Sequence, residues 1–194
     1  MNQLGINIGV KRRNLNIILQ NSTTQANGYV GLAPFVSEFF LTPYPVNNAI
    51  GTLPWHYTLG VHEYQHALQY ANSYYGASKI LHWLGGELAW GAAQSIAIPN
   101  WFFEGNAVLA ETQYSEQGRG RIPTFFNEFR SFAIENKTPK YDKLRNGSFQ
   151  DLLPDHYRLG YLMVRYGREK YGEEYWTNVL KRASSYSGII YPFS

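Results

Sequence analysis

The sequence from Thr58 to Tyr70 reads TLGVHEYQHALQY, and the rest of the chain is organised around it. It contains no proline, and apolar residues flank its centre, so it predicts a buried helix. His62 and His66 are four residues apart, which places both imidazoles on one face of that helix, about one turn apart. Both rings can therefore reach one metal ion, with the carboxylate of Glu63 beside the open side of the same ion.

Two histidines at this spacing also occur on half-exposed helix faces that bind nothing, so the H-E-x-x-H motif needs support from its surroundings. Burying two imidazoles and a carboxylate is costly unless they are paired or bound to a metal. Two histidine nitrogens, a neighbouring carboxylate and a rigid helix are what a zinc hydrolase requires. The motif therefore predicts zinc as a cofactor, and a third protein ligand is expected further along the chain.

Length and composition suit one globular domain over residues 1–194. Apolar residues make up 44% of the chain and charged residues 16%, which excludes a disordered chain. The net charge is only +3 and no block of lysine and arginine is present, so no nucleic-acid partner is expected. The chain has no cysteine, which excludes both a cysteine-only zinc site and a disulfide framework.

The stretch at 81–103 is apolar and long enough to be tested as a membrane span. Glu87 and His82 interrupt it, and a charge at mid-membrane is expensive. We therefore expect a buried helix that ends before Pro99 and no transmembrane segment. The first ten residues lack the charged-then-apolar order of a signal peptide, so the compartment stays open. An extracytoplasmic address would fit a chain trimmed from a longer protein.

Hydrophobic patterns predict an α+β chain with a mainly β lobe at 1–52 and a mainly α lobe at 53–194. A small mixed or antiparallel sheet is expected to precede the helices, with a turn at Asn27-Gly28 and a loop at 46–51. The predicted strands span 14–20, 29–33 and 37–41. The predicted helices span 54–74, 79–98, 101–115, 123–136, 154–171 and 172–185. Residues 117–121 and 137–151 are expected to be irregular.

Two glutamates compete as the third ligand, because Glu87 and Glu104 are both acidic residues in apolar surroundings. Glu104 lies near the start of its predicted helix, where the helix dipole alone would favour a carboxylate. Glu111 follows seven residues later, two turns on and on the same face. Two stacked carboxylates in an apolar helix are explained if one binds the metal and the other orients a ligating histidine.

The segment WFFEGNAVLAE at 101–111 resembles the W-x-x-E-G-x-A-x-x-x-E pattern of the gluzincins. These metallopeptidases hold zinc with the two histidines of H-E-x-x-H and a downstream glutamate. The pattern is similar to those of the aminopeptidase branch and of small peptidase MA-like domains, and the likeness extends to 27–29 and 157–167. The resemblance implies a zincin-like fold, with His62, His66 and Glu104 as zinc ligands. Glu104 is preferred to Glu87 because the residues around it match the pattern.

The resemblance also implies zinc-dependent hydrolysis of a peptide or protein substrate, with Glu63 as the general base. An oxyanion needs a second donor, and His156 and Tyr157 are candidates at the start of the predicted helix at 154–171. An edge strand at 37–41 is expected to bind the peptide by strand addition. The G-x-M-E-N segment with which the aminopeptidase branch holds a free N-terminus does not occur in the chain.

Three other hypotheses remain open from the sequence. The chain can be a zinc-binding but catalytically inactive interaction domain of a larger protein, although the intact Glu63 disfavours this. It can be a metal-free domain in which the histidines are incidental, and a chelator would then leave its stability unchanged. It can also be a zinc hydrolase that acts on a substrate other than a peptide.

Overall fold

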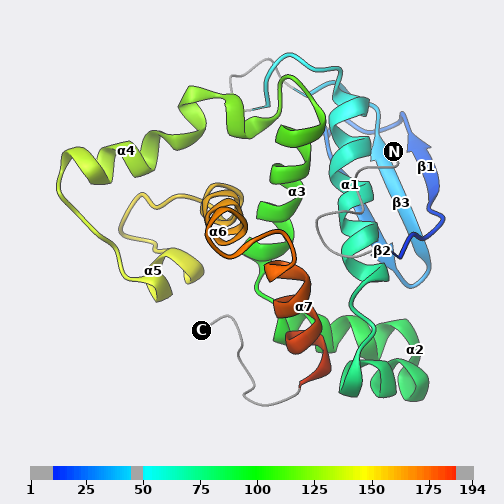
Figure 1. The fold of residues 1–194 in the computed structure, drawn as a ribbon. Helices are drawn as coiled ribbons and strands as arrows, with labels where there is room; N and C mark the ends of the chain where they lie inside the picture. The colour runs from blue at the N-terminus through cyan, green and yellow to red at the C-terminus, as the bar shows by residue number, and fades with distance from the viewer. Residues whose placement is uncertain (1–10, 45–49, 187–194) are drawn as a thin grey trace.

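The computed structural model describes residues 11–44 and 50–186, and it has the predicted α+β class, with strands first and helices after (Figure 1). The strands are β1 (Asn16–Gln20), β2 (Gly28–Leu32) and β3 (Phe35–Phe40). The α-helices are α1 (Trp55–Ala71), α2 (Gly76–Ala97), α3 (Asn100–Tyr114), α4 (Asn127–Ile134), α5 (Tyr141–Asn146), α6 (His156–Tyr171) and α7 (Tyr175–Ser185). Two 3-10 helices, η2 (Arg119–Arg121) and η3 (Pro123–Phe126), precede α4. The first ten residues and most of the predicted loop at 46–51 lie outside the described residues.

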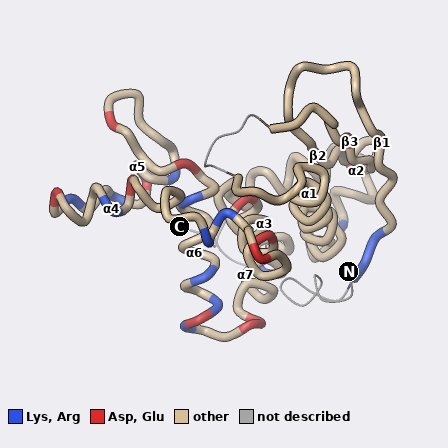
Figure 2. The backbone as a smooth tube through the Cα atoms, turned by 90° about the horizontal axis from the view of Figure 1, so that it is seen from above, with Lys and Arg blue, Asp and Glu red and all other residues tan. Residues whose placement is uncertain are grey.

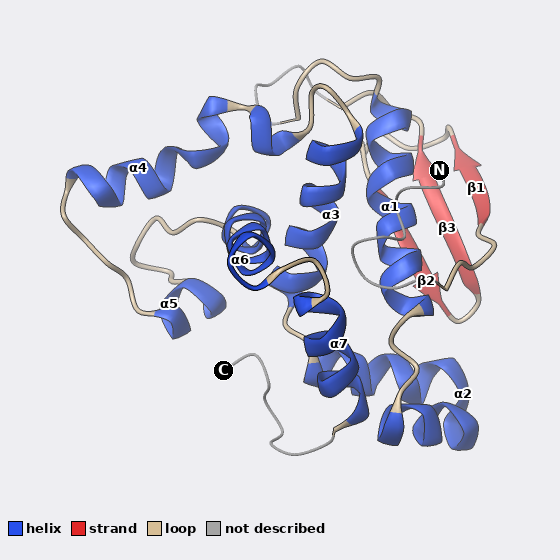
Figure 3. Cartoon of the chain, viewed as in Figure 1, coloured by secondary structure: helices blue, strands red, loops and turns tan. Residues whose placement is uncertain are grey.

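The three strands form a mixed sheet in the order β1-β3-β2 (Figure 3). β1 runs parallel to β3, with Ile18 opposite Glu38, and β2 runs antiparallel to it, with Val30 opposite Ser37. The prediction that residues 37–41 form a free edge is wrong, because β3 is the central strand. Strand order depends on long-range pairing that no local pattern encodes. Within the described residues, the edges of the sheet are β1 and β2.

The helix α1 lies between the sheet and α3, and α3 packs against α6 on its other side (Figure 1). This arrangement gives α1 two covered faces, which explains why most of its residues are buried. The core between α1, α3, α6 and α7 is rich in aromatic side chains. Its largest buried members are Trp101, Phe102, Tyr161 and Trp176. The core therefore holds α1 and α3 rigidly beside each other, and the candidate site lies between these two helices.

Glycines allow α3 and α6 to approach closely. A Cβ built on Gly160 would lie 1.8 Å from the carbonyl oxygen of Trp101, and one on Gly105 would lie 2.0 Å from the carbonyl carbon of Gly160. Each of these distances is far inside van der Waals contact, and the obstacle is backbone that cannot rotate away. The two helices can therefore keep this distance only with glycine at both positions.

Replacing Gly160 by alanine is expected to destabilise the chain by about 3 kcal/mol, because overpacking must push α3 and α6 apart. Gly60→Ala is the matched control, since Gly60 is also helical and has no atom within 4 Å of its added methyl group. That control should be neutral or stabilising by up to about 1 kcal/mol. Urea unfolding measures both variants. Equal stability of the two variants would show that the close approach of the helices is not required.

The structure differs from the predicted elements at 119–121, where η2 replaces irregular chain, at 123–136, where η3 and α4 replace one helix, and in α5 and α2. Residues 141–146 form the short helix α5 where irregular chain was expected, and the hydroxyl of Tyr141 accepts a hydrogen bond from Trp101 Nε1 at 2.9 Å. A helix of six residues is too short to show periodicity, so a tertiary contact decides it. The second helix is bent at Gly85 and Gly86, and Gly86 has φ +65. One face of α2 is buried and its outer face is exposed, so the prediction of a buried helix is wrong for the outer face.

The described residues contain no helix that is long and apolar enough to cross a membrane.

Candidate metal centre

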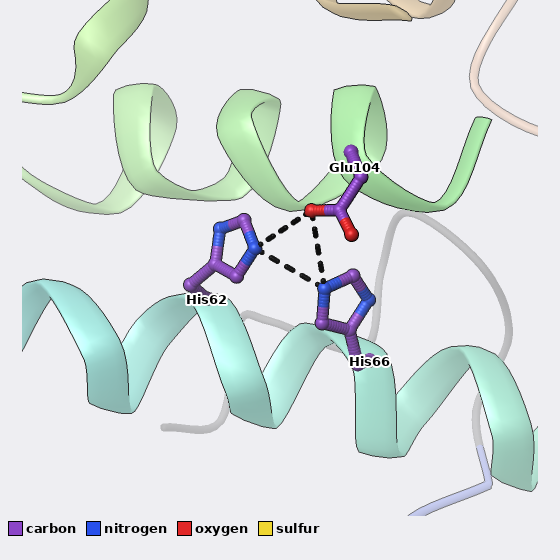
Figure 4. Close-up of side chains that lie close together, drawn as sticks. All are labelled: His62, His66 and Glu104. Atoms are coloured by element: carbon purple, nitrogen blue, oxygen red, sulfur yellow. Dashed lines mark hydrogen bonds and ion pairs between the residues drawn. The ribbon is translucent and has the colours of Figure 1, made fainter. Parts of the chain in front are cut away.

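Three side chains from two helices converge at one point (Figure 4). His62 and His66 come from α1, and Glu104 comes from the first turns of α3. The two Nε2 atoms of the histidines are 3.1 Å apart. Glu104 Oε2 lies 3.0 Å from Nε2 of His62 and 3.5 Å from Nε2 of His66. Ligands about 2.0 Å from a tetrahedral zinc ion are separated by about 3.3 Å, so these distances fit that ion.

The tautomer of each histidine follows from the partner of its other ring nitrogen. His62 Nδ1 lies 2.6 Å from a carboxylate oxygen of Glu111, which can only accept, and 3.0 Å from an amino group of Arg119, which can only donate. The shorter contact with Glu111 favours a proton on Nδ1. His66 Nδ1 lies 2.8 Å from the amide oxygen of Gln69. The amide nitrogen of Gln69 donates to the carbonyl of Phe103 at 2.9 Å, so the oxygen must face His66 and accept its proton.

When both rings are neutral, the two Nε2 atoms therefore present lone pairs to the same point, where the carboxylate of Glu104 also points. Three acceptors that meet without a donor repel one another, and water can screen them little, because His62 is buried and the His66 side chain is only 12% exposed. A proton or a metal cation at this point removes the repulsion. The donor set of two imidazoles and one carboxylate is one that zinc binds in catalytic sites.

The carboxylate of Glu111 links the metal centre to Arg119, whose side chain is 15% exposed. Arg119 Nε lies 2.9 Å from Glu111 Oε2, and an amino group of the same guanidinium lies 2.5 Å from Oε1. This fork-like pair holds Glu111 in place, and Glu111 in turn holds the ring of His62. The Arg119 guanidinium also lies 4.6 Å from the centre of the Tyr157 ring, in a cation–π contact.

The charges of the site shift its pKa values strongly. Burial would lower the pKa of His62, but Glu104 and Glu111 outweigh burial and raise it to about 9. Burial would raise the pKa of Glu111, yet Arg119 and His62 lower it to about 2. Burial likewise opposes ionisation of Glu104, and the two histidines hold its pKa far below the usual range. Without a metal, the site therefore keeps two ionised carboxylates and a proton on His62.

The metal-free chain is expected to lose stability as the pH rises from 7 to about 10. The folded pKa of His62 is raised from 6.5 to about 9, so its contribution is complete below pH 6.5 and is lost as the pH rises through about 9. At roughly 1.4 kcal/mol per pKa unit, the loss is on the order of 2–3 kcal/mol. Urea unfolding in the presence of a chelator measures it. The pH dependence of the unfolding free energy should be flatter in His62→Gln and unchanged in His82→Gln. A wild-type unfolding free energy that does not change with pH would contradict the prediction.

A cavity of about 530 Å³ opens above the three converging side chains. Its walls come from α1, α3, β2, η2 and the start of α6. Glu63 lines this cavity and is 4% exposed, and within the described residues its carboxylate takes part in no ion pair. A volume of this size suits a small ligand or a short stretch of peptide. The cavity therefore offers space for a reacting molecule beside both the metal ligands and a free carboxylate.

The two residues expected as oxyanion donors lie in different places. Tyr157 lines the cavity, and its ring centre is 6.1 Å from that of His62. Burial and the neighbouring carboxylates raise the pKa of the Tyr157 hydroxyl, so this group keeps its proton and can donate. His156 packs against Tyr157 with ring centres 4.5 Å apart but is not part of the cavity wall. The structure therefore brings Tyr157, and not His156, to the site.

Glu87, the competing ligand candidate, lies away from the metal centre. Its carboxylate is 2.7 Å from a guanidinium nitrogen of Arg13, at the bend of α2. It does not line the cavity. The bend rotates the second half of α2, so a periodic helix pattern could not show where Glu87 points. Of the two competing glutamates, only Glu104 lies beside the histidines.

Two polar residues of the site were not singled out from the sequence. Arg119 lies between Gly118 and Gly120, in a stretch that was interpreted only as a loop. A Cβ at Gly118 would lie 2.4 Å from the Thr112 backbone, so the loop packs tightly onto α3 and carries Arg119 inward. The glycines on both sides of Arg119 were the sequence feature that could have indicated this close packing of the loop. Gln69 is the second of these residues. An amide three residues after His66 on an apolar helix was the sequence feature that could have indicated its contact with the histidine.

Replacing Arg119 by glutamine should destabilise the chain by about 3 kcal/mol, because Glu111 would remain buried without its cation. It should also weaken zinc binding by about tenfold to a hundredfold, because His62 loses a firmly held partner. Arg121→Gln is the matched control, since Arg121, in the same loop, has the Thr112 carbonyl as its only side-chain hydrogen-bond partner among the described residues. Urea unfolding and zinc titration provide the measurements. If the loss of unfolding free energy in R119Q/E111Q equalled the sum of the losses in R119Q and E111Q, the two residues would not be coupled.

Known proteins do not add to this description. Comparisons of the chain with protein-family models, with curated proteins and with solved structures find no significant match. The inferences below therefore start from the geometry of the site.

Proposed function

We propose that this chain is a zinc-dependent hydrolase of peptide bonds, of the gluzincin type and with a zincin-like arrangement of its site. The observation that carries the proposal is the convergence of three acceptors, Nε2 of His62, Nε2 of His66 and a carboxylate oxygen of Glu104. The Nδ1 atoms of the two histidines contact Glu111 and Gln69, respectively. Such an arrangement is a site prepared for a cation.

When bound there, zinc would acidify water and polarise a carbonyl oxygen. Glu63 follows His62 on α1 and faces the same cavity, so its carboxylate is placed to take a proton from the attacking water. Glu63 then delivers this proton to the departing amine nitrogen, and the peptide bond breaks. Its lack of an ion pair within the described residues keeps the carboxylate available for this transfer.

The negative charge that develops on the carbonyl oxygen needs donors from the protein. The Tyr157 hydroxyl retains its proton and faces the cavity, which suits it to donate a hydrogen bond to that oxygen. Arg119 lies over the face of the Tyr157 ring and also lines the cavity, so it contributes positive charge to the same wall. We assign Tyr157 the role of oxyanion donor and His156 a packing role against its ring.

The edge strand β2 supports an extended peptide as the substrate. Ala26 to Val30 line the cavity, and β2 is an edge of the sheet within the described residues. A Cβ on Gly28 would lie 2.7 Å from Leu59 and 3.5 Å from the Glu63 carboxylate, so the β2 backbone approaches α1 closely at this glycine. A peptide that adds to β2 would pass over Glu63. This replaces β3 as the strand proposed to bind substrate.

The proposal is tested with a peptide library incubated with the purified chain, with the chain after chelation, and with the chain after zinc is returned. Peptide cleavage that is lost after chelation and restored when zinc is returned supports the proposal. Zinc binding with no cleavage of any peptide would favour the inactive interaction domain instead. Cleavage of esters or amides but not of peptides would retain the chemistry and change the substrate.

A further inference from the structure

The second helix exposes an apolar face that the proposed site does not use. Ile80, Trp83 and Leu84 are three and four residues apart in the first half of α2, before the bend at Gly85 and Gly86, so they lie on one helix face. Their exposed fractions are 60%, 83% and 68%, and Leu88, after the bend, is 75% exposed. Single exposed apolar residues are ordinary, but three on one face of the same helix segment form a patch. This patch is larger than the packing of the chain requires.

The opposite face of α2 already fulfils the helix's role in the fold. Ser78, Trp90, Ala93, Gln94 and Ala97 are buried there. Trp90 stacks on Tyr74 with ring centres 4.4 Å apart. Among the described residues, the outer face of α2 has no comparable covering. Its apolar side chains therefore remain available for a contact outside the chain.

Charge on α2 is confined to two residues with different surroundings. Glu87 is neutralised by Arg13, whose guanidinium nitrogen is 2.7 Å from its carboxylate. Lys79 is exposed and lies one turn before Trp83. The face therefore carries no uncompensated negative charge.

A group of lysines lies at the N-terminal end of α2. The ammonium groups of Lys11 and Lys181 each lie 5.6 Å from the centre of the Tyr75 ring. Tyr75 is the residue that precedes α2, and the backbone N–H of Lys79 donates to its carbonyl. No ion pair among the described residues involves any of these three lysines. The basic stretch that begins at Lys11 is visible beside the grey N-terminal trace in Figure 2.

We propose that the outer face of α2 docks this chain onto a lipid surface that carries anionic headgroups. The apolar side chains of Ile80, Trp83 and Leu84 would enter the boundary between headgroups and acyl chains. Lys11, Lys79 and Lys181 would contact the anionic headgroups. The charge of the lysines complements that of the surface, and the helix lies in the interface and does not span it.

The residue types favour lipid over a protein partner. Lysine is depleted and arginine enriched at protein interfaces, and the cluster around Tyr75 consists of lysines. The long lysine side chains can lay their apolar stems along the patch and keep their charge in water. Tryptophan at the edge of an apolar face is typical of membrane boundaries, where one part of the ring is buried and the other is wet. The exposed apolar side chains of Ile80, Trp83 and Leu84 also offer few hydrogen-bond donors or acceptors. They would therefore do little to fix the orientation of one particular protein partner.

Vesicle sedimentation tests the proposal with the whole chain. Vesicles of phosphatidylcholine alone are compared with vesicles that also contain phosphatidylserine, and both assays are run with and without zinc. Wild type should sediment with the anionic vesicles, and its binding should weaken as salt rises. Trp83→Ser/Leu84→Ser should lose at least tenfold in affinity. Ile134→Ser is the control, because Ile134 is equally exposed at the end of α4 but far from this face in sequence.

The lysines are tested separately from the apolar patch. Lys79→Gln/Lys181→Gln should reduce binding to anionic vesicles by roughly twenty-five-fold, at about fivefold for each of the two charges. Lys140→Gln/Lys170→Gln removes the same charge elsewhere and should bind like the wild type. Tryptophan fluorescence gives an independent signal, since insertion of Trp83 should shift the emission to shorter wavelength and Trp83→Phe should abolish the shift while retaining binding.

Three outcomes would overturn the proposal. One is a folded wild type that binds neither kind of vesicle. Another is binding that Trp83→Ser/Leu84→Ser leaves unchanged. The third is concentration-dependent self-association that the same double variant abolishes, because a second copy of the chain would then cover this face. Vesicle binding is independent of hydrolysis, so its failure and the failure of the proposed activity are distinguishable.

Discussion

Replacing Glu104 by alanine is expected to remove bound zinc from a chain that otherwise holds about one zinc ion. Glu104 supplies the only carboxylate oxygen that lies within 3.5 Å of both Nε2 atoms in the described residues. Its loss leaves two imidazoles, and two ligands hold zinc far more weakly than three. The affinity should fall on the order of a hundredfold or more. Metal analysis after dialysis, followed by zinc titration, measures the change.

Glu87→Ala is the matched control for this variant. It removes a glutamate of similar burial that pairs with Arg13 at the bend of α2. It should retain zinc and lose at most about 1 kcal/mol of stability, because both partners are partly exposed. Loss of zinc in Glu87→Ala with retention in Glu104→Ala would refute the assignment of ligands. A wild type that takes up no zinc even after reconstitution would remove the site altogether.

Replacing Glu63 by glutamine is expected to abolish most peptide hydrolysis while zinc stays bound. The amide has nearly the shape of the carboxylate but cannot accept and return a proton. Loss of a general base costs on the order of 10²–10⁴ in rate, and the loss should appear in kcat more than in KM. Metal analysis of the same preparation shows whether the zinc is retained. This combination separates a catalytic role of Glu63 from a role in binding the metal.

Glu38→Gln is the control for that substitution. Glu38 lies on β3, where its carboxylate accepts a hydrogen bond from the Tyr29 hydroxyl, and it does not line the cavity. Its replacement should leave both zinc and rate within about twofold of the wild type. A Glu63→Gln enzyme with undiminished rate would mean that another group takes the proton.

The roles of the two helices in the site could be predicted because the relevant spacing is local. His66 follows His62 by four positions and Glu111 follows Glu104 by seven, and these offsets place each pair on one face of its own helix. That geometry holds wherever the helix lies in the fold. The α+β class and the order of strands before helices followed in the same way from short-range patterns.

The choice between Glu87 and Glu104 depended on how α3 crosses α1, and the close contact of Gly105 with Gly160 sets the position of α3. Arg119 reaches Glu111 because a loop packs on α3. No residue of that loop carries a periodic signal. Such contacts join positions that are far apart in the sequence and depend on all the intervening elements at once.

The sequence by itself determined that two imidazoles share one helix face and that a pair of stacked carboxylates follows downstream. Only the tertiary structure decided which carboxylate meets them, that β2 and not β3 forms the edge beside Glu63, and that α2 leaves an apolar face exposed. The physical reason is that side-chain direction within a helix follows from a fixed backbone repeat. Convergence of separate elements, strand order and solvent exposure follow instead from long-range packing, to which a local pattern is blind.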